Sequence, residues 1–193
     1  PLAIQSLKLL INELDAKDTV SIVVYAGAAG AVLEPTKGDD KGKILSALDR
    51  LQAGGSTAGG EGLRLAYSLA KQNFSKNSVN RVMLLSDGDF NVGINDPNAL
   101  EDFVSRERES GVYLSILGFG GGNYNDYLMQ KLAQAGNGMA SYIDTLNEGR
   151  KVLNDDLSGS LFPIANDVKI QVEFNPATVA EYRLIGYETR LLN

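Results

Sequence analysis

The sequence predicts an α/β fold: a doubly wound, mostly parallel sheet with helices on both faces, followed by a C-terminal β appendage. Apolar stretches of strand length alternate with stretches of helical periodicity through residues 1–158, which we expect to form the first domain. Residues 159–193 instead contain strict alternation of apolar and polar side chains, as in an antiparallel strand with one exposed face. We therefore expect a separate β extension there.

The first elements are a helix and an edge hairpin. Leu2–Leu14 carries apolar side chains on one helical face, and Thr19–Tyr25 is almost continuously apolar, typical of a strand buried on both faces. The connection to a strand at Ala31–Glu34 is too short for a parallel crossover, so these strands should pair antiparallel. Pro35 is expected to end the second strand, because proline has no N–H for the ladder.

The middle of the first domain continues with helices around one strand. Apolar spacing predicts helices over Asp39–Leu51 and Gly60–Asn73, separated by a glycine-rich stretch. Val79–Leu85 has the composition of a buried strand. A long loop then leads to a helix opened by Asp96-Pro97, since proline suits the first helical turn.

The alternation persists to the end of the first domain. We expect a strand over Val112–Leu117, a helix over Tyr124–Ala135, a strand over Met139–Ile143 and a helix over Leu146–Leu157. In the extension, strands over Val168–Phe174 and Tyr182–Tyr187 should flank a turn at Asn175-Pro176.

Composition narrows the chemistry that the chain can perform. It has no Cys and no His, so thiolate and imidazole metal sites and a Ser-His pair are excluded, and any metal must be held by oxygen. Mg²⁺, Ca²⁺ and Mn²⁺ accept such ligands. The net charge is −6 and the basic residues are scattered, so we expect no nucleic-acid partner. No apolar run approaches the roughly 20 residues of a transmembrane helix.

Two segments could place metal ligands at one edge of the sheet. Ligands of open parallel sheets bind beyond the carboxyl ends of the strands, where Asp87 follows the apolar run ending at Leu85. Thr57 precedes a helix on the glycine-rich stretch and could add a hydroxyl oxygen. Ser56 and Asp89 could orient these ligands or a bound water. Taken singly, however, Asp-Gly is commonly a plain turn and Ser-Thr a helix cap.

A second interpretation of the same segment is enzymatic. Asp87 and Asp89, two positions apart at a strand end, suit a Mg²⁺-dependent phosphotransferase or phosphatase. Such an enzyme should place Lys or Arg beside the phosphate, and this loop has neither. The glycine-rich run Gly118–Asn123 lacks the acidic partner of a dinucleotide site, and no Gly-Lys-Ser/Thr follows either glycine-rich loop.

The chain resembles a von Willebrand factor type A domain of the bacterial subfamily with a C-terminal extension. The resemblance covers almost the whole chain, and it rests on Val20–Gly27, Gly54–Gly60, Arg81–Gly93, Leu117–Gly120, Asp167–Pro176 and Tyr182–Glu188. It implies a Rossmann-like fold and a non-enzymatic protein-binding module of adhesion type. Thr57 and Asp87 match the second and third elements of the family's metal-ion-dependent adhesion site. The first element, an Asp-x-Ser-x-Ser loop after an N-terminal central strand, is absent from this chain.

The resemblance also implies how the module would work. A Mg²⁺ ion, or Ca²⁺ or Mn²⁺, would take a carboxylate from a partner protein, with Phe90 and Tyr124 at the rim. Without the first element, we expect the cation to bind weakly or not at all. The missing strand would leave a gap open to strand exchange or self-association. The implied location is the bacterial cell envelope, periplasm or exterior. A third interpretation is a structural interaction domain with a vestigial metal site.

Overall fold

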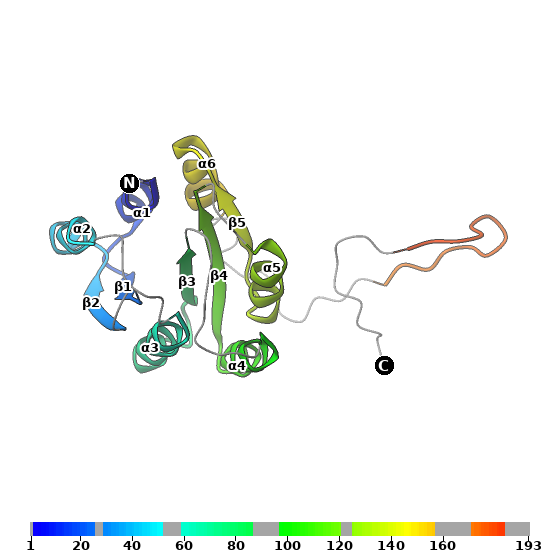
Figure 1. Cartoon of the computed structure of the whole chain (residues 1–193), viewed down its shortest axis with the longest axis horizontal. Coiled ribbons are helices and arrows are strands. Elements are labelled where there is room, and N and C mark those ends of the chain that lie inside the picture. Colours follow the sequence, from blue (N-terminus) through cyan, green and yellow to red (C-terminus); the bar gives the residue numbers. More distant parts are fainter. Residues whose placement is uncertain are drawn as a thin grey trace. The chain divides into compact units, whose positions relative to one another are not determined.

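The chain divides into two units, Pro1–Phe162 and Pro163–Asn193. The computed structural model describes residues 2–25, 29–51, 59–86, 97–120, 125–156 and 171–183, and each unit is considered by itself (Figure 1). The helices are α1 (Leu2–Glu13), α2 (Lys41–Asp49), α3 (Gly59–Gln72), α4 (Pro97–Glu109), α5 (Asp126–Ala135), α6 (Leu146–Arg150) and the π-helix η1 (Lys151–Asp156). The strands are β1 (Thr19–Val24), β2 (Gly30–Lys37), β3 (Asn80–Ser86), β4 (Val112–Phe119) and β5 (Ala140–Ile143).

The strands of the first unit form two sheets in the part of the chain that is described. β3, β4 and β5 are parallel in that order, with Leu84 opposite Ile116 and Ile116 opposite Ala140. β1 and β2 form a separate antiparallel pair, as the short connection between them predicts. The mixed α/β class and the predicted order of elements are therefore confirmed.

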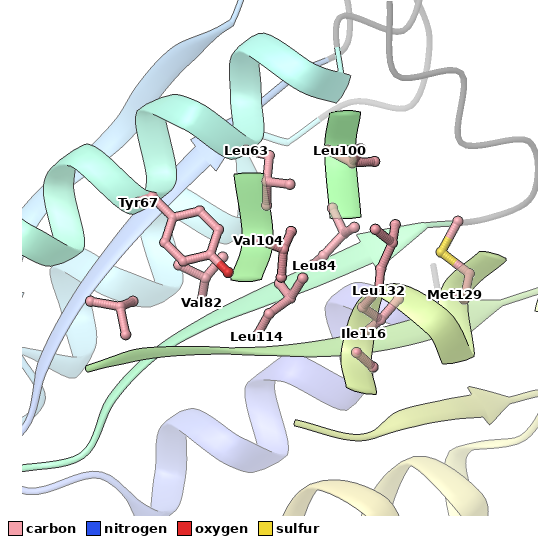
Figure 2. Packing of buried hydrophobic residues seen from close by; sticks show 12 residues of the cluster. Leu63, Tyr67, Val82, Leu84, Leu100, Val104, Leu114, Ile116, Met129 and Leu132 are labelled. Carbon is pink, nitrogen blue, oxygen red and sulfur yellow. The ribbon is translucent and has the colours of Figure 1, made fainter. Parts of the chain in front are cut away.

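Helices cover both faces of the parallel sheet, which is the doubly wound arrangement. On one face, α3, α4 and α5 pack on the inner strands through Leu63, Val104 and Leu132, which surround Leu84 and Leu114 (Figure 2). On the other face, α1 and η1 pack against side chains of β4 and β5. That cluster contains Leu2, Leu10, Leu117, Phe119, Ile143, Val152 and Leu153. A third cluster joins α1 and α2 to the β1–β2 pair.

Two predictions about the first hairpin are wrong. β2 continues through Pro35 to Lys37, because Pro35 lies where the ladder is irregular: Thr36 pairs with Val20, and the next pair is Leu33 with Ile22. A residue at such an irregularity needs no ladder donor, so proline is tolerated. β1 is not buried on both faces. None of its residues is buried, because β1 pairs only with β2 in the described chain.

The predicted last helix is also modified. α6 ends at Arg150 and the chain continues as the π-helix η1 to Asp156, so the helical stretch changes its hydrogen-bond spacing midway. Thr145 caps α6 by accepting a hydrogen bond from the Glu148 N–H at 3.2 Å. Val152 and Leu153 remain buried in the α1-side cluster, so the altered helix keeps its apolar contacts with the sheet.

The described part of the second unit is a reversal of the chain. Asn175 accepts backbone hydrogen bonds from Thr178 and Val179 at 3.0 Å each, which confirms the predicted turn. The Phe174 and Tyr182 rings meet across it with centroids 4.4 Å apart. Residues 171–183 contain no strand, so the strand predicted up to Phe174 is not seen over this portion.

Candidate functional site

The carboxyl ends of the strands meet at one edge of the first unit. Ser86, the last residue of β3, lies opposite Gly118 near the end of β4. Tyr25, directly after β1, donates a 2.5 Å hydrogen bond from its phenol to the main-chain carbonyl of Leu85. The ends of β1, β3 and β4 therefore lie together, although β1 does not pair with β3 in the described chain.

Helix α3 begins at the same edge. Its residue Gly62 lies so close to β1 that a Cβ atom there would be 2.4 Å from Cβ of Tyr25, so only glycine permits this approach. Leu63, the next residue, and Tyr67, about one turn later, pack in the cluster that holds Val82 and Leu84 of β3. The first turn of α3 thus lies against the end of β1, and the helix packs on β3.

The predicted site residues lie outside the described residues. Their chain neighbours nevertheless fix where their segments begin or end: Asp87 follows Ser86 of β3 directly, and Thr57 comes two residues before α3. The other predicted site residues outside the described ranges are Ser56, Asp89, Phe90 and Tyr124. The described neighbours of Asp87 and Thr57, which are Ser86 and the first turn of α3, therefore lie at one edge of the fold. The roles of Thr57 and Asp87 as metal ligands stay predictions.

Acidic side chains do not form a metal cluster in the described ranges. No group of three or more Asp or Glu side chains there is arranged to hold a metal ion. Ser86 is buried with 6% of its surface exposed, at the strand end from which the Asp87 segment leaves.

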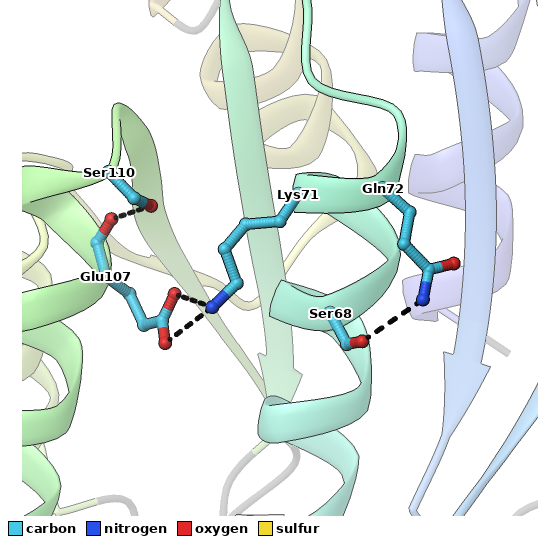
Figure 3. Close-up of polar contacts among 5 residues, drawn as sticks. All are labelled: Ser68, Lys71, Gln72, Glu107 and Ser110. Carbon is cyan, nitrogen blue, oxygen red and sulfur yellow. Dashed lines mark hydrogen bonds and ion pairs between the residues drawn. The ribbon is translucent and has the colours of Figure 1, made fainter.

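The sheet face beneath α3 and α4 holds a buried phenol that sequence reasoning missed. Tyr67 is 1% exposed, and its hydroxyl has no hydrogen-bond partner in the described structure. Burial, and then the charge of Glu107, raise the pKa of Tyr67. Glu107 itself is held by Lys71 of α3, with Nζ–O distances of 3.0 and 2.8 Å (Figure 3). The sequence predicts the helix over Gly60–Asn73 but does not single out Tyr67.

The opposite face of β3 carries a buried polar contact. Arg81 donates a hydrogen bond from Nη1 to Oγ of Ser115 at 2.6 Å, and Ser115 is fully buried. Burial lowers the pKa of Arg81. Arg81 and Ser115 project to the same face because Arg81 pairs with Tyr113, two residues before Ser115. This contact links neighbouring strands and lies away from their carboxyl ends, where the candidate site is.

Comparison with known families decides the identity of this fold. The sequence model of the von Willebrand factor type A domain matches residues 1–155. The chain belongs to the von Willebrand factor type A (VWA) family. A second family model, described as the C-terminal part of the uncharacterized protein YfbK, matches residues 159–193.

Relatives of this VWA chain include longer proteins. It is 52% identical over 192 residues to the uncharacterized protein YfbK of Escherichia coli K12, covering 100% of this chain and 33% of that protein. It is 30% identical over 139 residues to the uncharacterized protein sll0103 of Synechocystis, covering 72% of this chain and 32% of that protein. The chain thus spans about a third of these curated relatives.

Solved structures show the same fold. The VWA protein of Catenulispora acidiphila superposes with a TM-score of 0.69 at 19% identity, over 83% of this chain and 38% of that one. The SpRpn10 VWA domain gives a TM-score of 0.62 at 18% identity, over 88% and 86%. Proximal thread matrix protein 1 of the mussel byssus, with a zinc-occupied MIDAS motif, gives 0.57 at 21% identity, over 83% and 40%. No helix in the described ranges is long and apolar enough to cross a membrane.

Proposed function

We propose that this VWA domain is a non-enzymatic module that binds a protein ligand through a divalent cation held by Thr57 and Asp87. The observation that carries the proposal is the shared edge at which β3 ends and α3 begins, because the segments with these two residues start or end there. The hydroxyl and carboxylate would supply hard oxygen ligands, which Mg²⁺, Ca²⁺ or Mn²⁺ prefers.

The proposed recognition follows from the charge of the ion. A cation with few anionic protein ligands stays electrophilic and can accept a carboxylate oxygen from a partner. Thr57 and Asp87 supply only two of about six oxygens, so we expect weak cation binding by these 193 residues. A zinc-occupied MIDAS motif in a mussel byssus protein of the same fold supports a metal site in this family.

Paramagnetic Mn²⁺ offers a test that needs no partner. We expect Mn²⁺ to broaden the amide NMR signals of Gly59, Ser86 and Gly120, which flank the proposed site in the chain. Thr57→Ala and Asp87→Asn should each abolish this broadening, whereas Asp39→Asn, before α2, should leave it unchanged. Equal broadening of these signals in the wild type and both site variants would show that the cation does not bind there.

The enzymatic alternative predicts a different result. If Asp87 and Asp89 served a Mg²⁺-dependent phosphatase, generic phosphate esters would be hydrolysed and Asp87→Ala would abolish turnover. We expect no turnover above the uncatalysed rate. A structural interaction domain with a vestigial site would instead bind its partner equally well with and without EDTA, so a pull-down with chelator separates that alternative.

The cellular location belongs to the same proposal. We infer a place in the bacterial cell envelope, periplasm or exterior from the family resemblance. Immunoblotting of cytoplasmic, periplasmic and membrane fractions, with a cytoplasmic enzyme as control, tests it. Recovery of the protein in the fraction that contains the cytoplasmic enzyme would contradict an envelope location.

A further inference from the structure

The turn between α5 and β5, residues 136–139, contains the only Asn-Gly pair in the sequence, Asn137-Gly138. In such a pair the main-chain nitrogen of the glycine can attack the side-chain carboxamide of the asparagine. Glycine favours this attack because it has no side chain to hinder the approach and allows many backbone conformations. The conformation of the turn therefore decides whether the reaction can occur in the folded protein.

Asn137 ends α5 in a left-handed conformation. Its φ is 57°, the only positive φ of a non-glycine residue in the described ranges. The N–H of Gly138 donates to the carbonyl of Ala133 at 2.9 Å, and the N–H of Asn137 donates to the carbonyl of Gln134 at 3.2 Å. These two bonds form a Schellman motif, in which Asn137 occupies the position that favours glycine or asparagine. The Asn137 side chain itself is exposed to water.

The turn is also bonded to β4 on both sides of the Asn-Gly pair. Before the pair, the carbonyl of Gly136 accepts a hydrogen bond from the N–H of Leu114 at 2.9 Å. After it, the carbonyl of Met139 accepts one from the N–H of Ile116 at 2.8 Å. Between these bonds, Gly138 lies so close to β4 that a Cβ atom there would be 1.7 Å from the Leu114 carbonyl oxygen. The main chain of the turn is therefore held firmly in the closed structure.

The reaction needs the nitrogen that the Schellman bond occupies. The Gly138 nitrogen must lose its proton to solvent before it forms a bond to Cγ of Asn137. The bond from Cγ to Nδ2 then breaks, and Nδ2 takes a proton from water and leaves as ammonia. In the closed turn the N–H of Gly138 points to the carbonyl of Ala133, so solvent does not reach its proton. The turn must therefore open before Asn137 can react.

The product does not fit the closed turn. Water hydrolyses the cyclic imide to aspartate or to isoaspartate at position 137, and in isoaspartate the main chain passes through the β-carbon. This adds one main-chain atom before Gly138, where the Leu114 carbonyl leaves no space even for a Cβ atom. β5 has only four residues and pairs only with β4 in the described chain, so few other bonds hold it in register.

We propose that Asn137 is a site of hydrolytic deamidation that the fold controls. The closed turn between α5 and β5 protects the carboxamide, and opening of the turn permits the reaction with water. The isoaspartate that results prevents β5 from returning to its place beside β4. Molecules that remain open or unfolded for long are thereby changed irreversibly, whereas closed molecules keep the asparagine that the left-handed turn favours.

Two rates measured on the same bond test the control by the turn. Peptide mapping by mass spectrometry gives the rate of deamidation at Asn137 in the folded protein and in concentrated urea, at one pH and temperature. Hydrogen exchange by NMR gives the protection factor of the Gly138 amide. Both processes require the same opening, so folding should slow deamidation by the protection factor of Gly138 within about tenfold. A larger disagreement, equal rates with and without urea, or no deamidation in urea would each overturn the proposal.

Refolding after incubation in urea tests the consequence for β5. The yield of refolded wild-type protein, measured by near-UV circular dichroism, should fall in step with its isoaspartate content. Asn137→Gly keeps the left-handed turn without the carboxamide, so its yield should stay constant over the same incubation. Asn137→Asp adds the charge without lengthening the main chain, and we expect it to refold before incubation. An equal loss of yield in Asn137→Gly, or full refolding of molecules that contain isoaspartate, would contradict the proposal.

Discussion

Tyr25 Oη donates a 2.5 Å hydrogen bond to the main-chain carbonyl of Leu85 and so links β1 to β3, between which the described chain has no backbone ladder. Tyr67, on the adjacent helix α3, is a buried phenol without such a partner. The two tyrosines therefore allow opposite predictions for the same substitution.

Tyr25→Phe should destabilise the 193-residue chain. A hydrogen bond of this kind contributes about 1 kcal/mol, and its loss leaves the Leu85 carbonyl without that donor. The free energy of unfolding, measured by urea titration, should fall by about that amount. Tyr127→Phe is the matched control, because Tyr127 is 78% exposed and should tolerate the change. An unchanged unfolding midpoint in Tyr25→Phe would contradict the expected contribution of this bond.

Tyr67→Phe should leave stability unchanged or raise it. The buried hydroxyl has no partner in the described structure, so its removal abolishes a desolvation cost of about 1–3 kcal/mol. The ring keeps its edge contact with Phe103, 5.5 Å between centroids. Urea titration at pH 7 provides the measurement, and a loss of more than about 1 kcal/mol would mean that the hydroxyl has a favourable partner.

Tyr67 should also contribute to alkaline unfolding. Its pKa in the folded state is raised by burial, whereas the unfolded phenol titrates near the ordinary tyrosine pKa of 10.0. Above that pH the unfolded chain releases a proton that the folded protein retains, so stability falls by up to about 1.4 kcal/mol per pH unit. Tyr67→Phe should lose less stability than the wild type between pH 10 and 11. Parallel pH profiles would refute this linkage.

Lys41→Met should weaken the junction between α1 and α2. The Lys41 ammonium donates to the carbonyl of Leu14 at 2.5 Å, to that of Asn12 at 3.3 Å, and to that of Ile11, all at the carboxyl end of α1. A cation there satisfies terminal carbonyls and the helix dipole, so we expect a loss of about 1–2 kcal/mol. Lys43→Met, on the exposed side of α2, should cost less than about 0.5 kcal/mol. Circular dichroism melts of both variants compare them, and equal losses would contradict the capping role.

Gly138→Ala should be more damaging than Gly42→Ala. A Cβ atom at Gly138 would lie 1.7 Å from the carbonyl oxygen of Leu114 in β4, so the segment that leads into β5 would have to move away. We expect a loss of about 2 kcal/mol or more. Nothing lies within 4 Å of a Cβ at Gly42, inside α2, so alanine there should stabilise the helix by up to about 1 kcal/mol. A tolerated Gly138→Ala would show that the segment before β5 can shift without cost.

Periodicity predicted the order of the elements because most of them follow local rules. Leu2–Glu13 and Gly59–Gln72 are helices with apolar faces, and the antiparallel pairing of β1 with β2 follows from their short connection. Pro35 was misjudged because an irregularity in strand pairing depends on the partner strand, which a single segment does not reveal. The poor burial of Val20 and Ile22 likewise depends on a neighbour elsewhere in space.

The sequence predicts where the candidate site lies in the fold, but not the contacts that hold its surroundings together. The rule that ligands bind beyond parallel strands placed Thr57 and Asp87 near the end of β3, and the described residues around them meet at that edge. The sequence shows Tyr25 only as the end of an apolar run, and its bond to Leu85, 60 positions away, has no local sequence signal. The capping contacts of Lys41 similarly join residues from two helices.

β2 and β5, the outer strands of the two sheets, have features that hinder pairing with a strand of another molecule. β2 carries Pro35 at an irregular pairing, and β5 at the opposite side has only four residues. Edges of this kind are poor templates for another chain, which limits aggregation into fibres between molecules. Lateral growth from these two outer strands is therefore disfavoured, which helps to keep neighbouring copies from joining edge to edge.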